Sequence, residues 1–167
     1  MSRLFLMPFF LLIAFGCSSQ NTIEKTLERF NSGNVPYITT DEVLEIPGAV
    51  LLDTRKEEEY KVSHLENARW VGFRNVNLST IQQQIADKNT PIIVYCSIGV
   101  RSENVGETLQ KAGYTNVKNL YGGIFQWVNE GKTIVNSNAQ KTDSVHAYSK
   151  HWGKLLTKGT KVYSLKK

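Results

Sequence analysis

The sequence predicts an α/β fold in which a parallel β-sheet carries helices on both of its faces. Short, largely apolar stretches over residues 49–53, 91–96 and 117–121 alternate with segments whose apolar residues recur at helical spacing. Strands of this kind are typical of parallel sheets buried on both faces. The chain has 167 residues, of which 41% are hydrophobic and 21% charged, so it is long enough for one domain with its own core.

Two short helices are expected before the first strand. Three apolar residues recur at helical spacing within residues 22–33, and Gly33 can end that helix. In residues 37–46, Thr39 or Thr40 can cap a second helix.

The next elements are a strand, a charged helix, a brief strand and another helix. The strand over residues 49–53 follows a Pro-Gly turn. Residues 56–68 are charged and predict a short helix with a loop, and residues 68–71 predict a brief strand. Residues 75–89 place three apolar side chains on one helical face.

The second half of the domain repeats the alternation. A fully apolar strand over residues 91–96 leads into a helix that starts near Ser102 and is stopped by Gly113. A third strand is expected over residues 117–121, and a short helix between glycines over residues 122–131.

Chemically capable residues follow three of these strands. Asp53 and Cys96 stand at the ends of two strands, and Gly122-Gly123 follows the strand that ends at Tyr121. Because reactive groups in such sheets gather beyond the carboxyl ends of the strands, these three ends are expected to converge on one surface.

The first residues predict a signal peptide. The apolar run 4–15 is shorter than the roughly 20 residues that span a bilayer, but it suits the hydrophobic region of a signal. The tetrapeptide AFGC, with Gly16 before Cys17, resembles a bacterial lipobox. The resemblance implies a lipoprotein signal over residues 1–16 and a lipid on Cys17 that anchors the protein in the bacterial envelope, facing the periplasm. An ordinary secretory signal is the alternative.

The formal net charge of +5 is concentrated in the C-terminal tail. Residues 18–139 carry 12 Lys or Arg against 14 Asp or Glu, whereas residues 140–167 carry seven Lys and one Asp. On charge grounds the domain is not a nucleic-acid binder. The tail suits contact with anionic lipid head groups, or is a solvated face.

Cys96 is the candidate nucleophile. With lipid on Cys17, it has no disulfide partner within the chain. The loop after it can point backbone N–H groups at the sulfur, Gly99 permits an unusual backbone angle, and Arg101 adds a positive charge. The predicted effect is a lowered thiol pKa. The alternative is a small buried hydrophobe at a strand end.

Four motifs in chain order favour the nucleophile over the buried hydrophobe: LLDTRKEEEY, HLENARWV, IVYCSIGVRS and LYGGIFQW. Together they resemble the single-domain rhodanese family of thiosulfate sulfurtransferase-like proteins. The resemblance implies a rhodanese-like fold with a central parallel sheet of about five strands. It places the domain at residues 36–135, after a leader and helix at 17–35 and before a basic extension at 136–167 that packs on the domain.

The resemblance also implies a reaction. Cys96 would take a sulfane sulfur from thiosulfate or a similar donor as a persulfide, and pass it to cyanide or a thiol. The substrate-binding residues would be those of the loop and first helical turn, with the loop amides stabilising the persulfide and Arg101 holding the sulfite part of the donor: Ser97, Ile98, Gly99, Val100, Arg101 and Ser102. Phosphatases of this fold need five residues between the Cys and the Arg, and here there are four. Phosphatase or arsenate-reductase activity is therefore not expected.

The apolar Ile98 and Val100 leave the donor open, since several thiosulfate-using members carry basic residues there. A polysulfide, a persulfide or a protein donor is possible. They also leave open a rival function, a non-catalytic binding or sulfur-relay module.

Other candidate residues are expected to be structural. Asp53 and Arg55 would brace the loop through an ion pair, His64 would be a hydrogen-bonded strut, and Trp127 would lie in the core. No cofactor and no metal site are expected, because His146 and His151 are five residues apart without a Cys or acidic cluster. A monomer is expected.

Overall fold

The computed structural model describes residues 22–164, so Cys17 and the predicted signal lie outside the described residues. Its central sheet has five strands, all parallel, in the order β1-β5-β4-β2-β3. The strands, in chain order, are β1 (Tyr37–Ile38), β2 (Val50–Asp53), β3 (Arg69–Trp70), β4 (Ile92–Tyr95) and β5 (Val117–Leu120). The predicted α/β class and five-stranded parallel sheet are confirmed.

Helices cover both faces of this sheet. They are α1 (Ile23–Phe30), α2 (Thr40–Leu44), α3 (Glu57–Val62), α4 (Leu78–Gln84), α5 (Val100–Lys111) and α6 (Gly123–Asn129). Alternate residues of β4 point to opposite faces, as the strand period requires. Ile93 and Tyr95 belong to a core that includes residues of α2 and α6, and Ile92 and Val94 to a core with residues of α4 and α5.

Local signals explain most helix boundaries. Thr39, not Thr40, caps α2, because its hydroxyl accepts from Glu42 N and the Glu42 carboxylate accepts from Thr39 N. Gly113 follows α5 at a φ of 91°, as a helix stop requires. The prediction that Gly33 ends the first helix is wrong, since α1 ends at Phe30 and Asn31 already has an extended backbone.

Two elements were not predicted from the sequence. The strand β1 was not predicted, because a two-residue strand shows no periodicity and is defined by its partner β5. Residues 136–144, for which no element was predicted, contain β7 (Lys141–Thr142), which pairs antiparallel with β6 (Ile134–Val135). Their polar composition hid this hairpin.

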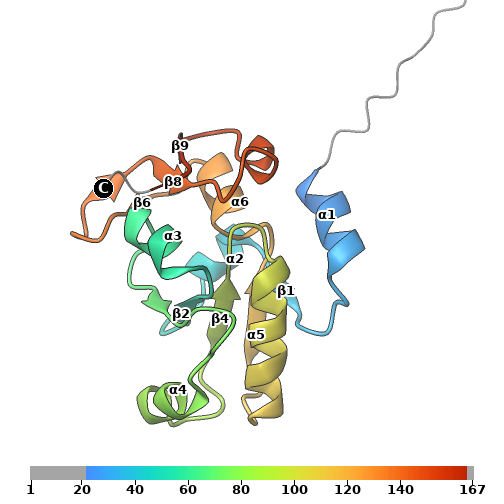
Figure 1. Cartoon of the computed structure of the whole chain (residues 1–167). Helices are drawn as coiled ribbons and strands as arrows, with labels where there is room; N and C mark the ends of the chain where they lie inside the picture. Colours follow the sequence, from blue (N-terminus) through green and yellow to red (C-terminus); the bar gives the residue numbers. More distant parts are fainter. Residues whose placement is uncertain (1–21, 165–167) are drawn as a thin grey trace, which may run out of the picture.

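The C-terminal segment folds back over the domain. It contains β8 (Ser144–His146), the 3₁₀ helix η1 (Trp152–Leu155) and β9 (Thr160–Val162), with β8 parallel to β9 and in contact with α3. In Figure 1 this segment and α1 lie at the end of the sheet where β4 leads into α5, and α4 lies at the opposite end. In the described part of the chain the longest helix, α5, has 12 residues, and none of the helices there could span a bilayer.

Candidate active site

Cys96 lies directly after β4, at the start of a tight loop that ends where α5 begins. The residue is only 1% exposed, and its Sγ accepts a hydrogen bond from Gly99 N at 3.1 Å. Gly99 has a φ of 105°, which glycine adopts without strain, and it is the N-cap of α5. The helix therefore starts at Val100, earlier than predicted, and Arg101 lies in its first turn beside the sulfur.

This surrounding lowers the pKa of the Cys96 thiol. Burial raises that pKa and is the largest single effect, but it is outweighed by groups that favour the thiolate. The main ones are the positive charge of Arg101 and the backbone N–H groups of Ile98 and Ser102. The loop therefore favours the thiolate form more than an ordinary cysteine environment does, which is the lowered pKa that the sequence predicted.

Two amide side chains hold the loop in shape. The Gly99 carbonyl accepts from Asn119 Nδ2 at 2.8 Å and from Asn31 Nδ2 at 3.0 Å. Asn119 also accepts from the Ser102 hydroxyl at 2.7 Å, so β5 is tied to both ends of the first turn of α5. Because these groups are hydrogen-bonded, the loop conformation is fixed before any substrate binds.

The start of α6 packs against the other side of the loop. Ile124 N donates to Cys96 O, and Phe125 N donates to Ser97 O, each at 3.0 Å. Gly123, with a φ of 54°, lies so close that a Cβ there would be 2.3 Å from the Cys96 carbonyl oxygen. The predicted convergence of this strand end with Cys96 is therefore confirmed.

Arg101 is bound by a carboxylate of the protein itself. Its two terminal nitrogens donate to the two carboxylate oxygens of Glu59, at 2.7 and 2.8 Å, and one of them also donates to Ser97 Oγ at 2.9 Å. Glu59, on α3, is fully buried. Burial raises the pKa of its carboxyl, but the hydrogen bonds and charge of Arg101 lower it to a net value below the ordinary one.

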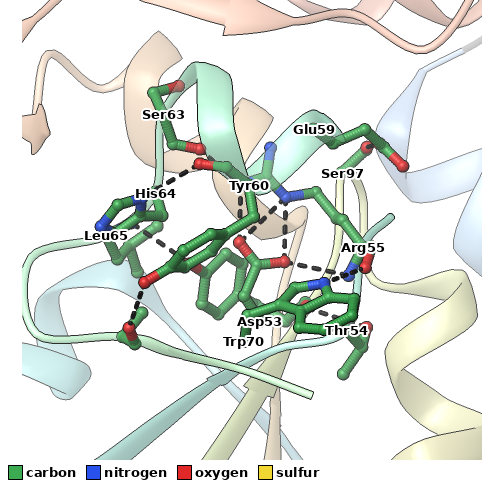
Figure 2. Close-up of polar contacts among 12 residues, drawn as sticks. Asp53, Thr54, Arg55, Glu59, Tyr60, Ser63, His64, Leu65, Trp70 and Ser97 are labelled. Atoms are coloured by element: carbon green, nitrogen blue, oxygen red, sulfur yellow. Dashed lines mark hydrogen bonds and ion pairs between the residues drawn. The ribbon is translucent and has the colours of Figure 1, made fainter. Parts of the chain in front are cut away.

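A second ion pair lies behind the first. Arg55 donates to Asp53 from Nη2 at 2.6 Å and from Nε at 3.0 Å, and both side chains are fully buried (Figure 2). Arg55 also donates to Ser63 O at 2.6 Å, and its own carbonyl accepts from Trp70 Nε1 at 2.8 Å. The predicted ion pair is present, and it ties the end of β2 to the end of α3 and to β3.

His64 lies outside the pocket over Cys96. Its ring stacks on the Tyr60 ring with centroids 3.9 Å apart, and its Nδ1 is 3.1 Å from Tyr60 O (Figure 2). Its backbone pairs with that of Val135. These contacts indicate a structural role for His64, as the sequence predicted.

A pocket of about 230 Å³ lies over Cys96, Ser97 and Arg101. Val100 lines it from α5, and Ile98 reaches it from the loop while packing into the core on the α6 side. The remaining walls come from the two flanks of the domain: Phe30 from α1, and Tyr148 and Trp152 from the C-terminal segment. Among the described residues, no group of three or more His, Cys, Asp or Glu is placed to hold a metal ion.

The sequence located the candidate nucleophile and its loop, but it missed several residues that surround them. Glu59 is one of three consecutive glutamates, and nothing local shows which of them faces inward. Asn119 gave a signal that could have been used, because it is a buried polar residue within a short strand. The pocket residues Phe30, Tyr148 and Trp152 gave no such signal in the sequence.

We expect the Cys96 thiol to titrate below the usual value of about 8.5, as followed by thiolate absorbance in the full chain carrying Cys17→Ser, which leaves Cys96 as the only thiol. Because the thiolate forms as pH rises through the pKa, a lowered pKa means more thiolate at neutral pH. Arg101→Gln is expected to move the titration upward, since burial and the unpaired Glu59 carboxylate then both oppose the thiolate. An unsubstituted loop that titrated at or above the usual value would contradict this prediction.

Comparison with known proteins agrees with this geometry. The model of the rhodanese-like domain family matches residues 39–130. A tRNA uridine(34) hydroxylase from Erwinia tasmaniensis is 32% identical over 114 residues, which cover 64% of this chain and 33% of that protein. Its namesake from Buchnera aphidicola is 31% identical over 146 residues, covering 75% and 45%. The chain thus spans less than half the length of these curated relatives.

Solved structures show the same fold. A thiosulfate sulfurtransferase from Pseudomonas aeruginosa superposes with a TM-score of 0.58 at 23% identity, over 71% of this chain and 22% of that one. A rhodanese-related protein from Thermoplasma volcanium superposes with a TM-score of 0.51 at 25% identity, over 60% and 97%. With the family match covering more than half of the chain and a cysteine loop of the geometry described, this protein belongs to the rhodanese-like domain family.

Proposed function

We propose that the protein is a sulfurtransferase that carries sulfur on Cys96. The Cys96 thiolate attacks the outer sulfur of thiosulfate or a similar donor, an Sγ–S bond forms, and the donor's S–S bond breaks. The leaving group, sulfite for thiosulfate, departs with the electron pair. A thiol or cyanide then attacks the outer sulfur of the persulfide, and the Cys96 thiolate is released.

The observation that carries the proposal is the position of Cys96 Sγ. Cys96 lines a pocket, and its Sγ accepts a hydrogen bond from Gly99 N and stands near Arg101 in surroundings that lower the pKa of the thiol. A lowered pKa supplies the thiolate nucleophile, and the same donors would stabilise the persulfide anion that replaces it.

The other loop residues have supporting roles in this proposal. Ser97 and Ser102 hold Arg101 and Asn119 in place through their hydroxyl groups. Arg101 supplies positive charge near the sulfur, while Asp53 and Arg55 fix the neighbouring strand end.

A binding or sulfur-relay module is the second candidate. The apolar Val100 and the aromatic residues around the pocket favour it, because such surfaces also serve for docking. We do not propose a tRNA hydroxylase activity for this chain, because the match covers only 33% of the Erwinia tasmaniensis hydroxylase. We also propose, from the sequence alone, a lipid anchor on Cys17 and a place in the bacterial envelope.

Intact-mass spectrometry of the full chain carrying Cys17→Ser tests the proposal. After incubation with thiosulfate, or with polysulfide, we expect one added sulfur atom that cyanide removes as thiocyanate. The matched control, Cys17→Ser with Cys96→Ala, should gain none. If a reduced and free Cys96 gains no sulfur from either donor, sulfur transfer from these donors is rejected. A partner retained by the Cys96→Ala variant would then favour the binding module.

A further inference from the structure

We propose that the pocket over Cys96 selects a sulfane-sulfur donor that carries a small apolar organic group and at most one negative charge, in preference to the thiosulfate dianion. The inference rests on the proposed function and names the substrate class for it. It comes from the aromatic walls of the pocket, Phe30, Tyr148 and Trp152, which belong to segments outside the residues that match the family model.

The two flanks of the domain meet beside the pocket. Phe30, at the end of α1, and Trp152, at the start of η1, are in edge-to-face contact with ring centroids 6.3 Å apart. Phe30 is 52% exposed and Tyr148 is 45% exposed, so these rings still present apolar surface to solvent. An apolar group bound against them would remove that surface from water, which favours binding.

The α1 wall is fixed to the active-site loop. The buried Glu103 carboxylate, on α5, accepts from the backbone N–H groups of Ser32, Gly33 and Asn34, at 3.2, 2.7 and 3.2 Å. Asn31 donates to the Gly99 carbonyl, as described above. These contacts hold the end of α1 over the cysteine loop.

The C-terminal wall is fixed as well. Asn129, on α6, donates to Leu155 O at 2.9 Å and accepts from Thr157 N at 2.7 Å. Tyr148 has a φ of 62°, a conformation rare for a residue with a side chain, and its N–H donates to His146 Nδ1 at 3.2 Å. A strained residue held at a pocket wall is consistent with a role there.

The charges in the pocket suit a donor of low charge. Apart from the Cys96 thiolate, Arg101 is the only described lining residue with a charged side chain, and Glu59 already binds both of its terminal nitrogens. Aromatic rings also lie near the guanidinium, with the Phe73 centroid at 5.2 Å and the Tyr148 centroid at 5.1 Å. A second negative charge would enter a largely apolar space whose guanidinium is already paired with the Glu59 carboxylate, which is unfavourable.

The size of the pocket matches a group of about one ring. Its volume of about 230 Å³ exceeds the roughly 150 Å³ of an engineered apolar cavity that binds benzene. A phenyl-sized group therefore fits above the sulfur.

Benzenethiosulfonate and thiosulfate form a matched pair of probes. Both hold the transferable sulfur on a sulfonyl sulfur, but a phenyl group replaces one negatively charged oxygen. The Cys96 thiolate attacks the outer sulfur, an Sγ–S bond forms, and the bond between the outer and the sulfonyl sulfur breaks. Benzenesulfinate or sulfite leaves with the electron pair, and the total charge is conserved in each reaction.

The experiment measures second-order rate constants for sulfur uptake by Cys96 from each probe, by intact mass, in the full chain carrying Cys17→Ser. We expect benzenethiosulfonate to react about ten- to a hundredfold faster than thiosulfate. Phe30→Ala and Trp152→Ala should each lower the ratio of the two rates by about threefold or more. The ratio is taken within one variant, so a general loss of folded protein cancels.

Leu44→Ala is the matched control, because Leu44 is a 67% exposed apolar residue on α2 that does not line the pocket. It should leave the ratio unchanged. Phe30 is half exposed, so its truncation tests the proposal even if Trp152→Ala does not fold. Uptake from both probes at similar rates, or a ratio that neither substitution lowers, would overturn this inference and leave sulfur transfer standing. No uptake from any donor would overturn sulfur transfer itself.

Discussion

Replacing Asp53 by alanine is expected to lower the free energy of unfolding by about 3–5 kcal/mol, the typical effect of removing one partner of a buried ion pair. Arg55 is fully buried, and without Asp53 it would keep Ser63 O as its hydrogen-bond acceptor. Burial lowers the pKa of the Arg55 guanidinium, but Asp53 raises that pKa above the ordinary value, so Arg55 is a cation in the native protein. The substitution leaves an uncompensated buried cation. Urea unfolding followed by circular dichroism measures the loss.

Glu57→Ala is the matched control for this substitution. Glu57 pairs with Lys61 at 2.8 Å, but both side chains are more than half exposed. Its loss should therefore cost no more than about 1 kcal/mol. A second comparison joins Asp53→Asn with Arg55→Met, which removes both charges and should recover part of the stability lost with Asp53→Ala. Equal losses for Asp53→Ala and Glu57→Ala would show that the buried pair is not a main contributor to stability.

The second large effect is expected for Gly123→Ala, which should both destabilise the fold and slow sulfur uptake by Cys96. The added Cβ would lie 2.3 Å from Cys96 O, 2.8 Å from Ser97 C and 2.9 Å from Ile98 N. These are backbone atoms of the cysteine loop, so the loop must move to relieve the contact. The φ of 54° adds strain for alanine. We expect a loss of about 3 kcal/mol or more, and an uptake rate at least about tenfold lower per folded molecule.

Gly113→Ala separates the effect of backbone strain from that of the steric contact with the cysteine loop. Gly113 also has a positive φ, 91°, but a Cβ there meets no atom within 4 Å. This control should show backbone strain alone, about 1–2 kcal/mol, with sulfur uptake unchanged per folded molecule. If Gly123→Ala behaved like Gly113→Ala in both measurements, the close packing of α6 against the loop would not be needed for the site.

Much of the fold could be predicted because the signals for it are local. The apolar stretches marked β2 and β4 to within one or two residues, and the Thr39 cap and Gly113 marked two helix boundaries. The brief strand β3 was also expected, but the equally short strands β1, β6 and β7, which are defined by their pairing partners, were not. The early start of α5 was missed because Gly99, in its unusual backbone conformation, serves as the cap.

The candidate site likewise has a part that the sequence predicts and a part that only the tertiary structure shows. The sequence by itself determined the candidate nucleophile, its strand end and the four-residue spacing to Arg101, because all of these are set by neighbours along the chain. Only the tertiary structure decided that Glu59, 42 residues from Arg101, binds its guanidinium, and that Asn119 and Asn31 hold the Gly99 carbonyl.

The same holds for the pocket. Phe30 and Trp152 are far apart in sequence, and they come together over Cys96 because Glu103 fixes the end of α1 and Asn129 fixes the C-terminal segment. Which side chains meet across such distances depends on how helices and loops dock on the sheet. Hydrophobic periodicity specifies the buried face of an element but not its partner, so the sequence determined the chemistry at Cys96 and the packing decided what surrounds it.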